Sequence, residues 1–361
     1  MNKKICVYAI AKNEIKFVER WYNSIKEADY VCVLDTGSTD GTFEKLKELG
    51  VICKQQIYSE FRFDTARNDS MKLIPPDTEI CVCVDLDEFF EPNWSTHLKK
   101  HWQSNTIRAK YRYTWNFNPD GSEGIVFMLD KIHKYGEFEW RHPVHETLYN
   151  KNNKLYSTIT IPNIQLNHRA DNSKSRSSYL PLLELSVKED PTNDRNMHYL
   201  GREYMFYKMY DKAIETLKKH LALPSAIWPA ERSASLRYIA KCYKNKDDNV
   251  NAEKYLLLAI LECPTTREAY FELGVFYFEN KKFLKSAFAF NEMLKITNRE
   301  LNYMSSPVCW GSLPYDYLSL CYYELGEYQK AIDYVNIALN FSKEKRIKNN
   351  LEIFKNKLKN N

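Results

Sequence analysis

The sequence has little of what marks several large classes of protein. It contains no apolar run of about 18 residues, so we expect no membrane-spanning helix. Its formal net charge is only +5 over 361 residues, and the charges are interspersed, which leaves no basic tract of the kind that binds nucleic acid. The nine cysteines follow neither a disulfide nor a zinc spacing, which favours buried free thiols in a reducing compartment.

The first residues of the chain do not resemble a targeting segment. Residues 1–4 lead at once into the short apolar run Ile5–Ala11, and polar residues follow directly. This run is too short and too promptly polar for a signal peptide, so we expect a soluble cytoplasmic protein. The length is sufficient for two domains of ordinary size.

The first domain, expected over residues 1–177, alternates short apolar runs with amphipathic segments. This pattern predicts a Rossmann-like α/β domain with a mostly parallel sheet. Strand-like runs after residue 90, at 108–115 and 125–129, predict an antiparallel extension. The expected parallel strands are 5–11, 30–34, 51–55 and 80–84. One expected helix runs through Val18, Trp21 and Ile25, and the others are 43–49 and 66–73.

The second domain, expected over residues 178–361, is predicted to be all-α and to carry a repeat. The step from Ala240 to Gly274 is 34 residues, which is the tetratricopeptide period. Small residues at the Gly201 position let paired helices approach, and large residues at Tyr204 and Tyr210 fill the space between neighbours. The recurring sets are Leu200, Gly201, Tyr204, Tyr210, Ala213; Ile239, Ala240, Tyr243, Ala252; Leu273, Gly274, Tyr277, Phe283, Phe290; and Leu318, Ser319, Tyr322, Tyr328, Ala331.

An acidic cluster follows the apolar run at residues 80–84. On a continuing strand, Asp85 and Asp87 would face the same pocket, and Glu88 adds a third carboxylate. Carboxylates this close repel one another unless a cation neutralises them, and hard oxygen ligands suit Mg²⁺ or Mn²⁺ bound to phosphates. The alternative is a strand that ends in a solvated acidic turn.

Polar residues also end the other predicted strands, where open α/β sheets bind ligands. Lys12, Asn13 and Glu14 follow the first strand, and Asp35 opens the loop Asp-Thr-Gly-Ser-Thr-Asp-Gly-Thr after the second. Asp35 could accept a hydrogen bond from a base N–H or a ribose hydroxyl. The alternative is a capped turn, with Thr39 or Asp40 as the helix cap.

Four segments in this order resemble glycosyltransferase family 2, the inverting enzymes of the GT-A fold. The direct fusion to tetratricopeptide repeats is similar to a bacterial subgroup that includes sublancin-type peptide S- and O-glycosyltransferases. The resemblance implies a nucleotide-sugar donor, most often a UDP-sugar, and a Mn²⁺ or Mg²⁺ ion. The four segments are Ala11-Lys12-Asn13-Glu14, Asp35 to Thr42, Phe63-Asp64-Thr65-Ala66-Arg67-Asn68 and Val84-Asp85-Leu86-Asp87-Glu88.

The resemblance also implies roles for individual residues. Asp35 would contact the base, Arg67 the nucleotide, Asp85 the ribose or the metal, and Asp87 the metal. The segment containing Ala11, Asn13 and Glu14 would belong to the donor site. His168 lies where the subgroup places a histidine near the diphosphate, and imidazole suits Mn²⁺ better than Mg²⁺; the alternative is a structural histidine.

Single displacement requires a base near the acceptor. The segment from Arg141 to Glu146 aligns with the subgroup's Val-His-Glu element, so we predict Glu146 as the base, with His145 orienting it or the acceptor. Glu88 is the alternative base.

The acceptor is left open by the sequence. It is a peptide or protein side chain, or else a saccharide or glycolipid, and the repeats could bind a polypeptide or form a homodimer. The aromatic residues Tyr113, Trp115 and Trp140 could stack on a sugar or pack in the core. A catalytically inactive adaptor is the non-enzymatic alternative. Nucleotidyl transfer is disfavoured, because no glycine-rich loop follows the first strand.

Overall fold

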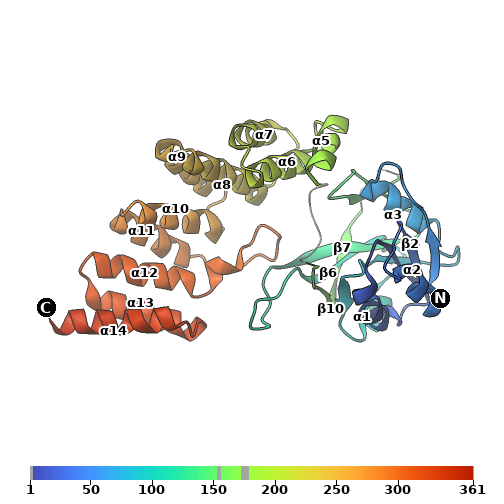
Figure 1. The fold of residues 1–361 in the computed structure, drawn as a ribbon, viewed down its shortest axis with the longest axis horizontal. Helices are drawn as coiled ribbons and strands as arrows, with labels where there is room; N and C mark the ends of the chain where they lie inside the picture. Colours follow the sequence, from blue (N-terminus) through green and yellow to red (C-terminus); the bar gives the residue numbers. More distant parts are fainter. Residues whose placement is uncertain (1–2, 153–155, 172–178, 361) are drawn as a thin grey trace. The chain divides into compact units, whose positions relative to one another are not determined.

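The computed structural model describes residues 3–152, 156–171 and 179–360, which form two compact units (Figure 1). The first unit is Met1–Ser186 and the second is Val187–Asn361, with the division inside the helix α5 (Tyr179–Glu189). The boundary expected from the sequence, between residues 177 and 178, falls outside the described residues.

The first unit contains an eight-stranded sheet in the order β3-β2-β1-β4-β7-β6-β10-β5. β1, β2, β3 and β4 are parallel, β7 is antiparallel to β4 and β6, and β10 runs parallel to β6 and antiparallel to β5. A two-stranded sheet pairs β8 with β9. The bounds are β1 Ile5–Ala11, β2 Tyr30–Asp35, β3 Ile52–Gln55, β4 Ile80–Cys83, β5 Glu88–Phe90, β6 Arg108–Thr114, β7 Val126–Lys134, β8 Phe138–Arg141, β9 Thr147–Asn150 and β10 Thr158–His168.

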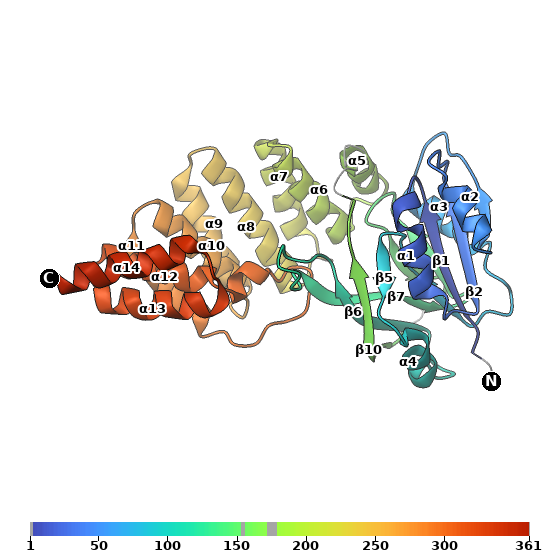
Figure 2. The ribbon, with the colours of Figure 1, turned by 60° about the horizontal axis from the view of Figure 1, so that its bottom comes forward.

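Both faces of this sheet are covered by other elements. Alternate side chains of β1 point to opposite faces, so they belong to two different cores. Ile5, Val7 and Ala9 face a core shared with α1 (Ile15–Ile25), α2 (Thr42–Glu48) and α4 (Trp94–His101). Cys6 and Tyr8 face a second core with the β8–β9 pair and the end of α3 (Phe63–Met71). Figure 2 shows α1 beside β1 and β2. A strand buried on both faces is uniformly apolar, as in parallel sheets generally.

The predicted mostly parallel α/β domain is confirmed, with several local differences. α3 begins at Phe63, earlier than the expected start at Ala66. α2 is capped by Gly41, whose positive φ of 91° suits glycine, while the Asp40 carboxylate accepts a hydrogen bond from the Thr42 backbone N–H at 3.0 Å. The β8–β9 pair was not predicted.

The second unit consists of helices that pack as successive antiparallel pairs, which confirms the predicted all-α repeat domain (Figure 1). The pairs are α6 with α7, α8 with α9, α10 with α11 and α12 with α13, followed by α14. The bounds are α6 Asp194–Phe206, α7 Tyr210–Ala222, α8 Pro229–Asn245, α9 Asn249–Glu262, α10 Arg267–Glu279, α11 Phe283–Leu294, η1 Pro307–Trp310, α12 Leu313–Glu324, α13 Tyr328–Phe341 and α14 Lys345–Lys359.

The small residues of the repeat are required by close helix packing. A Cβ atom on Gly201 would lie 2.5 Å from Leu217 Cγ, and one on Gly274 would lie 2.8 Å from the Phe290 ring. All nine cysteines lie among the described residues and are free thiols. Within the described ranges, no helix has both the length and the apolarity to cross a membrane.

Candidate active site

The site is built at the carboxyl ends of β1, β2 and β4. β1 lies between β2 and β4 in the sheet, so the strand order reverses at β1: β2 and β3 lie on one side of it and β4 on the other. In open α/β sheets, ligands bind in the crevice at such a switch point. The loops after β1 and β2 hold each other in place. The Asn13 backbone N–H donates to Ser38 Oγ at 2.8 Å, and the Thr39 N–H donates to Asn13 Oδ1 at 2.8 Å. Asn13 has a φ of 56°, a conformation that asparagine tolerates better than most residues.

Asp35 is fully buried at the end of β2. Its Oδ1 accepts hydrogen bonds from the Gly37 N–H at 3.0 Å, the Ser38 N–H at 2.8 Å and Gln55 Nε2 at 2.9 Å. Its Oδ2 has no hydrogen-bond partner among the described residues. A buried acceptor without a donor is costly, so this oxygen is suited to a donor supplied by a ligand.

Arg67, on α3, lies in the centre of the site and joins two predicted catalytic segments. Its Nη1 and Nη2 donate to Asp85 at 2.8 and 3.1 Å, and its Nε forms a short hydrogen bond to Glu146 Oε1. Lys131, on β7, also donates to Asp85 Oδ2 at 3.1 Å. Burial alone would raise the pKa of Asp85, but the charges of Arg67 and Lys131 hold it well below its usual range. Both oxygens of Asp85 are therefore engaged by cations of the protein itself.

Asp85 and Asp87 lie in the turn after β4 and not on a continuing strand, because the strand ends at Cys83. The expectation that strand alternation would place both on one side was therefore wrong. Asp87 is directed elsewhere: its Oδ2 lies 3.1 Å from Nε2 of His168, the last residue of β10.

His168 is oriented by a second hydrogen bond, between its Nδ1 and the Trp115 carbonyl oxygen at 2.7 Å. Because a carbonyl only accepts, Nδ1 carries the proton, and Nε2 faces Asp87. Burial alone would lower the pKa of His168, but the hydrogen bond and charge of Asp87 raise it above the ordinary value.

Glu88 is enclosed beside this pair. It is 2% exposed, its Oε1 accepts from Tyr113 OH at 2.7 Å, and its Oε2 accepts from the Asp85 N–H at 2.9 Å. Burial raises the pKa of Glu88. Tyr113 thus packs in the core and holds Glu88.

The segment from His142 to Glu146 is fixed against α3. The Phe63 N–H donates to the Pro143 carbonyl at 2.9 Å, and the Asn68 side chain exchanges two hydrogen bonds of 2.8 Å with the Trp140 backbone. His145 has a φ of 52°, and its ring packs against Tyr179. Trp140 is 3% exposed and lies under the Arg67 guanidinium, whereas Trp115 is 39% exposed beside His168.

The structure thus forms two clusters from the predicted residues: Arg67 with Asp85 and Glu146, and Asp87 with His168. Ala11, Asn13 and Glu14 lie in the loop that supports Asp35; the Ala11 carbonyl accepts from the Thr36 N–H, and the Glu14 N–H donates to Thr42 Oγ1. Sequence reasoning missed Lys131 and Gln55. Lys131 carried little signal in the sequence, because the same strand also contains Asp130, His133 and Lys134.

Comparison with known protein families gives a match in the first unit. The model of the family described as glycosyl transferase family 2 matches residues 6–167. No curated protein matches the sequence.

Solved structures resemble the chain over about half of its length. MamA is 23% identical, with a TM-score of 0.36 over 45% of this chain and 85% of MamA. The APC/C hetero-tetramer Cut9-Hcn1 is 16% identical, with a TM-score of 0.39 over 51% of this chain and 33% of that one. PilF of Pseudomonas aeruginosa is 10% identical, with a TM-score of 0.37 over 48% of this chain and 71% of PilF. These scores are too low to support a functional argument. The family match over residues 6–167 supports a glycosyltransferase domain of family 2 in the first unit.

Proposed function

We propose that the protein is a metal-dependent inverting glycosyltransferase that moves a sugar from a UDP-sugar to a side chain of a polypeptide. The observation that carries the metal dependence is the pairing of Asp87 with His168.

Asp87 and His168 have the geometry of two ligands of one ion. Their facing atoms are 3.1 Å apart, and neighbouring ligands of an octahedral ion with bonds of about 2.1 Å lie about 3 Å apart. The second nitrogen of His168 donates to a backbone carbonyl, which is the usual support of a metal-binding histidine. A ligand set of one imidazole and one carboxylate suits Mn²⁺ better than Mg²⁺. Asp85 is less suitable as a ligand, because Arg67 and Lys131 occupy both of its oxygens.

The buried Oδ2 of Asp35 supports a uracil base. A carboxylate oxygen only accepts hydrogen bonds, so it pairs with the N3–H of uracil and not with N3 of cytosine, which is itself an acceptor. Gln55 and the Gly37 and Ser38 amides fix the other oxygen, which directs Oδ2 at the ligand.

The other charged groups fit the transfer step. A bound divalent cation would offset the negative charge that develops on the departing nucleoside diphosphate. Glu146 is the proposed base, oriented by Arg67, which also ties it to Asp85. Glu88 is the poorer candidate, because it is buried and both of its oxygens accept hydrogen bonds within the protein.

The repeat domain supports a polypeptide acceptor. Arrays of helical pairs present extended surfaces that bind polypeptides, and such a module has no evident use for a small saccharide acceptor. Self-association through the same repeats is the other use of this surface, and analytical ultracentrifugation distinguishes it.

The test is a comparison of Asp87→Asn with Asp130→Asn. Asp130 is a half-exposed aspartate of the same domain that pairs with Arg108, so it controls for the loss of a charge. We expect wild type and Asp130→Asn to bind UDP in calorimetric titrations only with Mn²⁺ present, and to hydrolyse a UDP-sugar slowly without an acceptor. Asp87→Asn should lose both properties. Metal-independent UDP binding by wild type, or unchanged hydrolysis in Asp87→Asn, would refute the metal assignment.

A further inference from the structure

A second group of metal-binding side chains lies in the helical unit. Three residues each contribute one ligand atom, and these atoms lie within 4.8 Å of one another: Asp194 in the first turn of α6, His220 in the last turn of α7 and Glu231 in the first turn of α8. His220 is fully buried and Glu231 is 3% exposed. Neither the family match nor the proposed transfer reaction uses these residues.

The strongest single observation is the unsatisfied nitrogen of His220. Within the described part of the chain, the buried Nε2 has no hydrogen-bond partner, yet it faces Glu231 Oε1 at 3.4 Å. Two ligands of a tetrahedral zinc ion with bonds of about 2.1 Å lie about 3.4 Å apart. The separation therefore exceeds a good hydrogen bond and matches two ligands of one ion.

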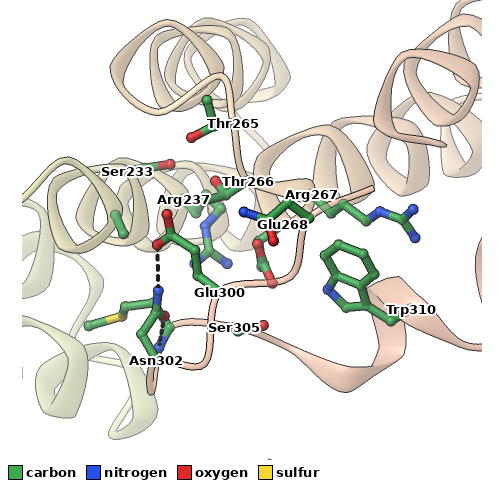
Figure 3. A pocket seen from close by; sticks show the side chains of 13 residues that line it. Ser233, Arg237, Thr265, Thr266, Arg267, Glu268, Glu300, Asn302, Ser305 and Trp310 are labelled. Atoms are coloured by element: carbon green, nitrogen blue, oxygen red, sulfur yellow. Dashed lines mark hydrogen bonds between the residues drawn. The ribbon is translucent and has the colours of Figure 1, made fainter. Parts of the chain in front are cut away.

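The remaining polar atoms of this pair are held from outside. Tyr303 OH donates to Glu231 Oε2 at 2.9 Å. Tyr303 follows Asn302 in the sequence, and Figure 3 shows Asn302 near Glu300 and Ser305. His220 Nδ1 lies 2.9 Å from Ser235 Oγ, which lies 2.7 Å from His198 Nδ1. Metal-binding histidines and carboxylates are commonly supported by such outer hydrogen bonds.

Proton counting along this chain allows the metal-binding tautomer. Ser235 has one hydroxyl proton, so it can donate to only one of its two histidines. If Ser235 donates to His198, then His220 Nδ1–H donates to Ser235, and the lone pair of His220 Nε2 faces the two carboxylates. In that case two buried acceptors, His220 Nε2 and Glu231 Oε1, face each other close to the half-buried Asp194 carboxylate, and a cation between them would relieve this arrangement.

We propose that Asp194, His220 and Glu231 bind one zinc ion, with water as the fourth ligand, and that the ion links α6, α7 and α8. One imidazole and two carboxylates are ordinary zinc ligands. The ion joins the first helical pair to the first helix of the next pair, so it stabilises the start of the repeat array. This site is separate from Asp87 and His168, which belong to the other unit.

The test uses the full chain in which the Asp87→Asn and His168→Gln substitutions remove the other candidate ligands. After treatment with a chelator and dialysis, we expect this parent to bind one equivalent of Zn²⁺ by calorimetry, and its melting temperature to rise when zinc is added. Adding His220→Gln should weaken zinc binding at least 100-fold. The control His198→Gln, in the same buried network but outside the ligand set, should stay within about tenfold of the parent.

Two further measurements distinguish loss of the zinc site from loss of folding. Glu231→Gln retains an oxygen for Tyr303 but loses the charge, so it should weaken zinc binding without unfolding the apo chain, as judged by circular dichroism. Co²⁺ bound to the parent should give the visible absorption of a tetrahedral site, and His220→Gln should remove it. A folded parent that binds no zinc, or zinc binding that His220→Gln leaves unchanged, would overturn the proposal.

Discussion

The role of Arg67 gives the sharpest prediction about stability. Arg67 is 5% exposed and is hydrogen-bonded to both Asp85 and Glu146. Replacing it by Met keeps most of the side-chain volume but leaves the Glu146 carboxylate, whose side chain is 10% exposed, without this cation. Removing one partner of a buried ion pair costs about 3–5 kcal/mol. Lys131 remains beside Asp85, so we expect the lower limit, about 3 kcal/mol in the free energy of unfolding.

Urea unfolding followed by tryptophan fluorescence measures this cost. Five of the seven tryptophans, at positions 21, 94, 102, 115 and 140, lie in the first unit, so the signal reports mainly on that unit. The control is Arg141→Met, which removes an exposed pair with Glu139 and should cost no more than about 1 kcal/mol.

A double substitution tests the physical reason. If the cost arises from a stranded carboxylate, then Arg67→Met combined with Glu146→Gln should be more stable than Arg67→Met alone by at least about 1 kcal/mol. A cost for Arg67→Met below about 1 kcal/mol, or strictly additive effects in the double variant, would show that Arg67 does not hold the site together in this way.

Three other predictions follow from single contacts. Asp35→Asn turns the buried acceptor Oδ2 into a donor, so in calorimetric titrations UDP should bind about 1–3 kcal/mol more weakly while CDP gains relative to UDP; an unchanged preference would contradict the base assignment. Gly274→Ala places a Cβ 2.8 Å from the Phe290 ring and should lower the stability of the helical unit by about 1–3 kcal/mol in thermal melts, whereas Gly311→Ala, with nothing within 4 Å, should not. Burial lowers the pKa of His133 to about 4 in the folded protein, whereas it is about 6.5 in the unfolded chain. Between these two pH values only the unfolded chain binds a proton at His133, so the free energy of unfolding falls as the pH is lowered. Wild type should therefore lose about 2 kcal/mol more than His133→Gln between pH 7 and pH 5 in urea unfolding, and parallel losses in the two proteins would rule this out.

The outline of the fold could be predicted from the sequence because its signals are local. β1 was predicted with its observed bounds, since an apolar run of that length between polar residues fits a doubly buried strand. The repeat was found because Gly201 and Gly274 recur where helices touch. The β8–β9 pair was missed, because its short strands carry no clear periodic pattern in the sequence. Phe138 and Trp140 are buried by contacts with residues of β1 and the end of α3, which lie far away along the chain.

The sequence predicted candidate residues for the site, but it could not predict which of them contact one another. Asp85 and Asp87 are two residues apart, yet the turn after Cys83 sends one toward Arg67 and Lys131 and the other toward His168. The sequence by itself determined most of the helices and strands and the polar residues that follow the parallel strands, because periodicity and residue type act over a few neighbours. Only the tertiary structure decided which carboxylate meets a cation and which meets a histidine, because those partners come from α3, β7 and β10, far away along the chain.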